Sequence, residues 1–218
     1  PDWAEAWHYL GVAQLEGGKR DEALKSFTKA ASRDYAWPDL LNESPWSRLT
    51  AVAGQASSGG DLKEACRILE EHMLQNAPQA WRIWGLNNLG LLRRDYGSAQ
   101  QRDGKTGDAK KSWVIARDAY LEAVKLIPKH PELTGTQKAG LLNDCGLMFH
   151  YHFDDKDTAM EYYEQGYEAD PTHPDVCLNI GRIQMERGKL EEAERVLAGS
   201  VQRDDVAELL RRVRSMRK

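Results

Sequence analysis

The densest set of side chains able to do chemistry is the run from His150 to Asp157, which reads His-Tyr-His-Phe-Asp-Asp-Lys-Asp. Imidazole and carboxylate groups are the ligands that proteins offer to divalent metals such as zinc. The run falls at a predicted turn between two helices, where polar and acidic residues are common. If the first helix continued through His150 and His152, these two side chains would point to different sides. We therefore predict no metal site here.

Other signatures of catalysis are missing from the sequence. It contains no nucleophile elbow, Walker loop, Rossmann glycine pattern or zinc-protease helix. Gly17-Gly18 and Gly59-Gly60 are predicted to be turn glycines rather than phosphate cradles. Serine, histidine and aspartate are plentiful, but their spacing places no catalytic triad. We predict that the chain is not an enzyme and that it binds no cofactor.

Composition narrows the classes of partner. The chain has 218 residues, 41% of them hydrophobic, and 30 Lys+Arg against 34 Asp+Glu give a net charge of −4. Proteins that bind nucleic acids usually carry a concentrated basic face, so we predict no nucleic-acid partner. No apolar run approaches the ~20 residues needed to span a bilayer, which argues against membrane insertion.

The cysteines and the first residues bear on location. Cys66, Cys145 and Cys177 have neither metal-knuckle nor redox-pair spacing, and we predict three buried thiols in a reducing compartment. No signal-peptide pattern opens the chain, so a cytoplasmic location is favoured. The abrupt start at Pro1 suggests a fragment of a longer protein or a processed form.

A pattern of small and bulky residues recurs along the chain. Ala23 follows Gly11 by 12 residues, and Ala193 follows Gly181 by the same 12. Three looser copies place their small residues at Ala53 and Ala65, at Gly90 and Ala116, and at Gly146 and Ala159. Small residues let two helices approach closely, and a hairpin of two helices cannot bury both of its faces alone. The recurrence therefore predicts a stack of helical hairpins.

The pattern resembles the tetratricopeptide repeat, whose signature and spacing are matched by Trp7, Leu10, Gly11, Ala23, Phe27 and Ala30. The resemblance implies an all-α fold, a right-handed α-α superhelix (solenoid) of about five hairpins with a C-terminal capping helix. It extends over nearly the whole chain, which we treat as a single domain over residues 1–218. The expected units are 2–37, 45–78, 79–130, 131–172 and 173–204, and residues 205–218 form the cap.

Two stretches depart from this regular spacing. In the third unit 26 residues separate Gly90 from Ala116, and we assign the excess to a flexible inserted loop over residues 95–111. This loop is either a lip over one end of a binding groove or an inert excursion. The second excess lies in residues 35–45, where Ser44-Pro45 is predicted to cap and begin the next helix.

In the family that the chain resembles, the first helix of each hairpin lines a concave groove. The resemblance therefore implies a partner-binding wall that contains His8, Val12, Asn87, Asn88, Leu91, Asn143, Asp144, Leu147, Asn179 and Arg182. Each asparagine amide offers both a donor and an acceptor, so it can pair with the backbone of an extended peptide whatever its sequence. The same amides can instead bond to neighbouring helices.

Three functions compete on this basis. The first is a non-catalytic scaffold or adaptor that binds an extended peptide or a partner's helix in the groove. The second is an architectural or self-associating spacer in a larger protein, which would make a homo-oligomer possible. The third is a metal protein or enzyme centred on His150 and His152, which we disfavour for the reasons given above.

Overall fold

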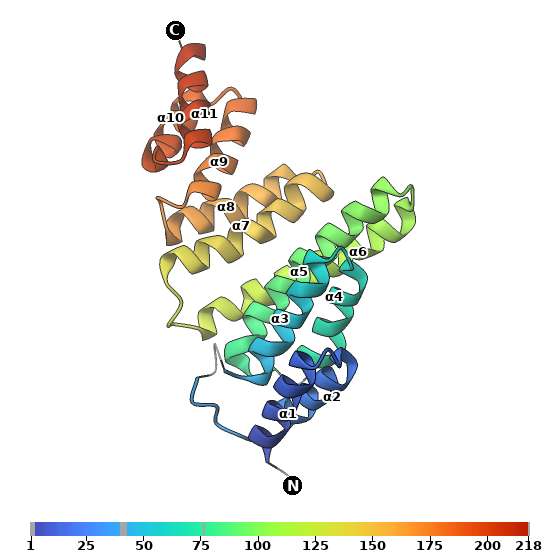
Figure 1. Cartoon of the computed structure of the whole chain (residues 1–218). Coiled ribbons are helices and arrows are strands. Elements are labelled where there is room, and N and C mark those ends of the chain that lie inside the picture. The colour runs from blue at the N-terminus through green and yellow to red at the C-terminus, as the bar shows by residue number, and fades with distance from the viewer. Residues whose placement is uncertain (1–2, 40–42, 76, 218) are drawn as a thin grey trace. The chain divides into compact units, whose positions relative to one another are not determined.

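The computed structural model describes residues 3–39, 43–75 and 77–217. The described residues form helices joined by turns, and they contain no strand. Contacts divide the chain into two compact units, residues 1–119 and residues 120–218. The boundary lies inside helix α6 (Thr106–Leu126) rather than at a predicted repeat boundary. Figure 1 shows the succession of helices from the N-terminus to the C-terminus.

Unit 1 is built from helices that pair as neighbours along the chain. They are α1 (Ala4–Glu16), α2 (Arg20–Ala31), α3 (Pro45–Ser58), α4 (Leu62–Ile68), the π-helical turn η1 (Leu69–Met73), α5 (Gln79–Arg102) and the first part of α6. Ser44 caps α3 through reciprocal hydrogen bonds with Ser47, and Pro45 is the first residue of that helix. This confirms the start predicted from Ser44-Pro45.

Unit 2 continues the same arrangement to the C-terminus. After the end of α6 it contains η2 (Ile127–Lys129), α7 (Gly135–His152), α8 (Lys156–Ala169), α9 (Pro174–Glu186), α10 (Leu190–Leu197), η3 (Ala198–Ser200) and α11 (Asp204–Met216). In α11, Val206, Leu210 and Val213 are buried against α9 and α10. The predicted capping helix is therefore present, with its apolar side turned inward.

Most of the hairpins share one turn geometry. In four of them a glycine adopts the left-handed conformation, with φ of 74° at Gly18, 86° at Gly60, 77° at Gly104 and 73° at Gly188. The next residue then donates its backbone N–H to a carbonyl five residues back, as Lys19 does to Gln14 at 2.8 Å. The α7–α8 turn uses Asp154 instead, and its closing bond from Asp155 to Phe149 spans one residue more.

The glycine of the repeat is required because a bulky side chain of the second helix covers it. A Cβ atom added to Gly11 would lie 2.6 Å from Phe27, and one added to Gly181 would lie 2.6 Å from Leu197. Gly146 makes the same close approach to Tyr163. These contacts confirm the close helix approach predicted from the spacing.

The third hairpin follows a different register from the predicted one. Gly97, not Gly90, takes the repeat position, because a Cβ there would lie 2.6 Å from Trp113, which stands 16 residues later as Phe27 does from Gly11. Ala109 then takes the place of Ala23, and both are fully buried. Ser112 donates to Gln100 at 2.7 Å as Ser26 does to Gln14.

The predicted loop over residues 95–111 is therefore wrong. The structure continues α5 to Arg102 and begins α6 at Thr106, so a short turn around Gly104 replaces the loop. The additional residues lengthen the two helices at their other ends, where α5 begins at Gln79 instead of near Gly90. Buried Trp81, Ile83 and Leu86 stabilise these extra turns through apolar contacts.

Among the helices whose residues are described, none combines the length and the apolar character needed to cross a membrane.

Candidate functional site

In unit 2, two of the predicted wall residues bond to each other. The Asn179 side chain on α9 donates from Nδ2 to Oδ1 of Asn143 on α7 at 2.9 Å. Both side chains are only 4% exposed. This is the structural one of the two roles considered for these amides, because a buried amide that lacks a partner is costly.

The other predicted wall residues of unit 2 remain partly accessible. Asp144 and Leu147 on α7 and Arg182 on α9 are half-buried. Arg182 Nη1 lies 3.5 Å from the hydroxyl of Tyr151, whose side chain is 54% exposed. This stretch of the wall therefore presents one acidic and one basic residue around an aromatic ring.

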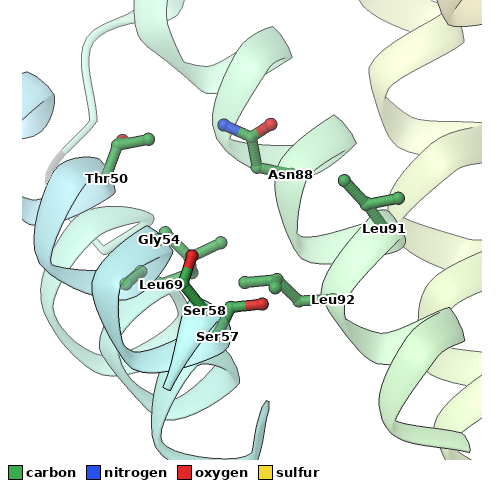
Figure 2. Close-up of a pocket in the computed structure, with 9 residues that line it drawn as sticks. Thr50, Gly54, Ser57, Ser58, Leu69, Asn88, Leu91 and Leu92 are labelled. Atoms are coloured by element: carbon green, nitrogen blue, oxygen red, sulfur yellow. The ribbon is translucent and has the colours of Figure 1, made fainter. Parts of the chain in front are cut away.

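In unit 1, Asn88 and Leu91 line a pocket of about 290 Å³. Its walls come from α3, η1 and α5, as Figure 2 shows. The full lining is Thr50, Ala53, Gly54, Ser57, Ser58, Leu69, Asn88, Leu91 and Leu92. Asn87, predicted beside Asn88, is half-buried and is not part of this lining.

The pocket has an apolar floor and an uncharged polar rim. Ala53, Leu69 and Leu92 are buried at its base. The Thr50 hydroxyl at the rim is already used, since it donates to the carbonyl of Trp46 at 2.9 Å. Within the part of the chain that the structure describes, the Asn88 amide has no hydrogen-bond partner, so both its donor and its acceptor remain available.

Gly54 opens this pocket. A Cβ atom at Gly54 would meet nothing within 4 Å, whereas the equivalent residue of α1 is Val12, also one position after the repeat's small residue. Sequence reasoning did not identify Thr50, Gly54, Leu69 or Leu92 as site residues. A glycine in the middle of an otherwise regular helix was the available signal, because it lowers helix stability unless its small size is needed.

His8, predicted to face the groove, is covered by the chain itself. It is 3% exposed, and the Trp37 ring lies 4.9 Å from its ring, between centroids. Burial, and secondly the nearby charge of Arg48, lowers the pKa of His8. The prediction that His8 lines an open groove is therefore wrong, while Val12, one turn further along α1, is half-buried.

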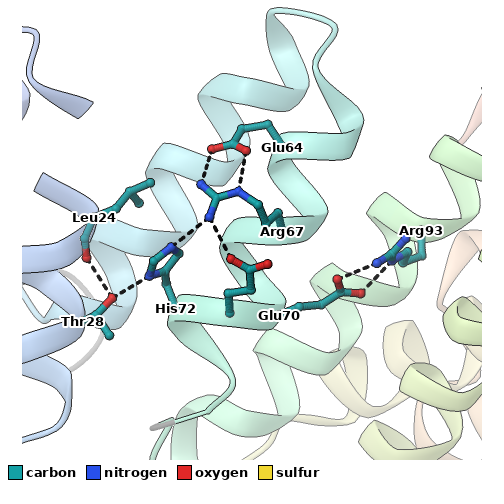
Figure 3. A network of polar contacts seen from close by, with 8 residues as sticks. Leu24, Thr28, Glu64, Arg67, Glu70, His72 and Arg93 are labelled. Atoms are coloured by element: carbon teal, nitrogen blue, oxygen red, sulfur yellow. Dashed lines mark hydrogen bonds and ion pairs between the residues drawn. The ribbon is translucent and has the colours of Figure 1, made fainter. Parts of the chain in front are cut away.

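A polar network holds the walls of the pocket in place. Glu70 on η1 accepts two hydrogen bonds from Arg93 on α5, at 2.7 and 2.5 Å. His72, also on η1, lies 2.8 Å from the Thr28 hydroxyl on α2 and 3.3 Å from Arg67 on α4, as Figure 3 shows. η1, which supplies Leu69 to the pocket floor, is thereby tied to its neighbours on both sides.

The tautomer of His72 follows from these contacts. Arg67 can only donate, so Nε2 of His72 accepts, and Nδ1 carries the proton of the neutral ring. Nδ1 then donates to Thr28 Oγ1, which passes its own proton to the carbonyl of Leu24 at 2.8 Å. Burial, and secondly the charge of Arg67, lowers the pKa of His72.

Comparison with known proteins agrees with this hairpin geometry. The family profile "Tetratricopeptide repeat" matches residues 5–34, and a second profile with the same description matches residues 154–215. The chain is a tetratricopeptide-repeat domain. Proteins built from these repeats generally mediate protein–protein interactions and are typically non-catalytic scaffolds.

Solved tetratricopeptide-repeat structures resemble the whole chain. TTC0263, a thermophilic TPR protein of Thermus thermophilus, has a TM-score of 0.58 and 19% identity, with 97% of each chain covered. The structure of an IFIT1 monomeric mutant with Gppp-AAAA has a TM-score of 0.59 and 18% identity, covering 100% of this chain and 47% of that one. At these identities the similarity shows the all-α repeat fold.

One curated relative is closer in sequence. The Photosystem I assembly protein Ycf3 of Rippkaea orientalis (strain PCC 8801 / RF-1) is 32% identical over 100 residues, which make up 43% of this chain and 54% of the relative. The tetratricopeptide-repeat chain thus spans about half the length of this relative.

The histidine-rich turn between α7 and α8 has structural partners. The buried ring of His150 stacks on Tyr151, with centroids 4.1 Å apart, and burial lowers its pKa. Asp155 caps α8 by accepting from the backbone N–H of Thr158 at 3.0 Å. Nowhere among the described residues do three or more His, Cys, Asp or Glu side chains gather closely enough to hold a metal ion.

The cysteines of this tetratricopeptide-repeat domain are free and buried, as predicted. Burial raises the pKa of the thiols of Cys66 and Cys177 to about 11 and that of Cys145 to about 12. Since the thiolate is the nucleophile, these side chains are poorly suited to covalent chemistry near neutral pH.

Proposed function

We propose that the chain is a non-catalytic adaptor that binds a segment of another protein on the inner wall of its first helices. The unit 1 pocket lined by Gly54, Leu69, Asn88 and Leu92 is its anchoring site. The observation that carries the proposal is an amide without a partner, that of Asn88, above an uncharged apolar pocket in the described part of the chain.

The pocket favours a particular kind of side chain. Its volume of about 290 Å³ accommodates one leucine, methionine or phenylalanine side chain over the floor of Leu69 and Leu92. Burial of such a side chain contributes about 1.5–3 kcal/mol. Asn88 would at the same time hydrogen-bond the backbone of the bound segment, whose direction and register it helps to fix.

The relatives support this reading at a coarse level. An assembly protein such as the cyanobacterial relative named above has to hold partners, which fits an adaptor. The IFIT1 structure contains the nucleotide compound Gppp-AAAA. The lining of the pocket here includes no charged side chain, and the chain carries a net charge of −4. A polyanion would find no cationic partner in this pocket, so we favour a protein ligand.

Selection from a displayed library of random linear peptides tests the proposal. Peptides retained by the wild-type domain are expected to share one apolar residue, and Gly54→Leu should abolish their retention because its side chain fills the pocket. Gly107→Leu is the matched control, since a Cβ there also meets nothing within 4 Å and Gly107 lies outside the pocket lining. Retention that is equal in both variants would contradict the proposal.

Self-association is a second candidate, favoured by exposed apolar residues of the N-terminal hairpin. Trp3 is 73% exposed, Tyr9 64% and Leu10 43%. Surface patches of this kind often mark association sites. Light scattering over a range of concentrations tests this: growth of the mass that Trp3→Ala and Leu10→Ala reverse supports it, and a strict monomer contradicts it.

A further inference from the structure

The segment that follows α2 folds back onto α1. The Tyr35 hydroxyl donates to the carboxylate of Glu5. The Trp37 ring lies 4.9 Å from the His8 ring and 4.8 Å from the Tyr35 ring, the second contact at an angle of 74°. Tyr35 and Trp37 thus form an aromatic pair that covers one face of α1.

The covered face belongs to the predicted binding wall. Glu5, His8 and Val12 are spaced by three and four residues, so they share one side of the helix. The equivalent of His8 in the next hairpin is Thr50, because Gly11 and Ala53 occupy the same repeat position. Thr50 lines the open pocket. The same part of the wall is therefore open in the second hairpin and filled by the chain's own aromatic residues in the first.

The aromatic pair is an imperfect occupant. Nδ1 of His8 and Nε1 of Trp37 are both buried, and neither has a hydrogen-bond partner among the described residues. A buried polar atom without a partner weakens the contact that buries it. A ligand that offers the same rings together with groups that bond these atoms would be held more firmly than the segment itself.

We propose that the face of α1 formed by Glu5 and His8 is a binding site for a tyrosine–tryptophan type of segment. Tyr35 and Trp37 occupy the site when no partner is bound, and an aromatic segment of a partner protein exchanges with them. The identity of the exchanging ligand as a protein rests on the proposed function, whereas the aromatic site itself does not.

A peptide supplied in trans tests the site. The probe is the capped peptide of residues 33–39, Arg-Asp-Tyr-Ala-Trp-Pro-Asp, added to the full chain carrying Tyr35→Ala and Trp37→Ala. We expect saturable NMR shifts at Glu5 and His8 with a Kd on the order of 1 mM, the effective concentration that a short tether replaces. The wild-type chain, whose site is filled, should bind at least about tenfold more weakly.

Controls separate this result from non-specific binding and from the pocket. The same peptide with alanine at both aromatic positions should cause no shift, and Gly54→Leu added to the double variant should leave binding unchanged. An absence of shifts at Glu5 and His8, or equal binding of the alanine peptide, would overturn the aromatic site. Loss of library binding by Gly54→Leu concerns only the pocket, so the two proposals fail separately.

A milder variant keeps the test valid if the double variant does not fold. Tyr35→Phe removes only the hydroxyl that Glu5 accepts, so its fold should persist. We expect carbethoxylation of His8, followed residue by residue with mass spectrometry, to be faster in Tyr35→Phe than in wild type, while that of His150 stays unchanged. Equal rates at His8 would contradict the idea that this segment can leave its site.

Discussion

The Asn179 amide donates to the side-chain oxygen of Asn143 at 2.9 Å, and both side chains are buried between α7 and α9. Asn88, the third asparagine considered for the inner wall, has no such partner among the described residues. One chemical type thus has two roles in this domain. The pair in unit 2 joins neighbouring hairpins, and the single amide in unit 1 is available to a ligand.

A double-mutant cycle tests the structural role of the pair. Asn179→Ala should lower the free energy of unfolding by about 1–3 kcal/mol, because it leaves the buried amide of Asn143 without its partner. Asn143→Ala should do the same, and the double variant should lose less than the sum by at least about 0.5 kcal/mol. Urea denaturation measures all three, and additive losses would show that the hydrogen bond contributes little.

Asn88→Ala is expected to leave stability within about 0.5 kcal/mol of wild type, because no hydrogen bond inside the described chain is lost. The same variant should lose affinity for the selected peptides. A clear loss of stability in urea denaturation would mean that this amide also has a structural partner.

Two glycine-to-alanine variants test the register of the third hairpin. Gly97→Ala should destabilise by about 1–3 kcal/mol, since its Cβ would lie 2.6 Å from Trp113 and 3.0 Å from the backbone oxygen of Ala109. Gly54→Ala, which meets nothing within 4 Å, should stabilise by about 1 kcal/mol through helix propensity. Melting curves that rank the two variants in the opposite order would contradict the register.

Stability is expected to fall as the pH drops below about 6.5, the pKa of an unperturbed histidine. Burial is the main cause that lowers the pKa of His8, His72 and His150 in the folded chain. The unfolded chain therefore takes up protons first, and its free energy falls relative to the folded state. This contribution is complete above that pH and is lost progressively as the pH falls towards the lowered values.

Urea denaturation at pH 7.5 and at pH 5.5 measures this change. The carboxylates with lowered pKa, such as Glu64 and Asp205, act below about pH 4.5 and do not contribute in this window. His72→Gln should reduce the difference between the two pH values, because glutamine does not titrate. A variant with the full wild-type difference would remove His72 from the account.

Native-state thiol reactivity offers another check. Burial raises the pKa of all three cysteines to about 11 or 12, so at pH 8 a disulfide reagent should react slowly with the folded chain. Unfolding in urea should release three fast-reacting thiols. Rapid reaction of one thiol in the native state would indicate local opening around it.

The hairpin repeat could be predicted because it depends on local spacing. Gly11, Gly146 and Gly181 need their bulky partners at fixed distances along the chain, and that requirement is visible in the sequence. The third hairpin misled the prediction because Gly90 and Gly97 are seven residues apart, about two helical turns, and so share a helix face. The turn glycine Gly104 follows Gly97 by the same seven residues that separate Gly18 from Gly11, and this was the signal that could have corrected the register.

The candidate site depended on contacts between hairpins, which spacing does not fix. Asn143 and Asn179 match the pattern of a ligand-binding wall, yet their separation in space makes them each other's partner. His8 lies at a wall position but is covered by Trp37, which follows α2 in an irregular segment with no repeat signal. Only Gly54, which replaces the side chain found at Val12, announced the pocket in the sequence.

The central claim is that an apolar side chain of a partner binds in the pocket beneath Asn88. Isothermal titration of one selected peptide into wild type, Asn88→Ala, Gly54→Leu and Gly107→Leu tests it most directly. We predict no detectable binding to Gly54→Leu, binding at least about tenfold weaker to Asn88→Ala, and wild-type affinity for Gly107→Leu. Wild-type affinity for Gly54→Leu would place the peptide elsewhere on the domain and contradict the account.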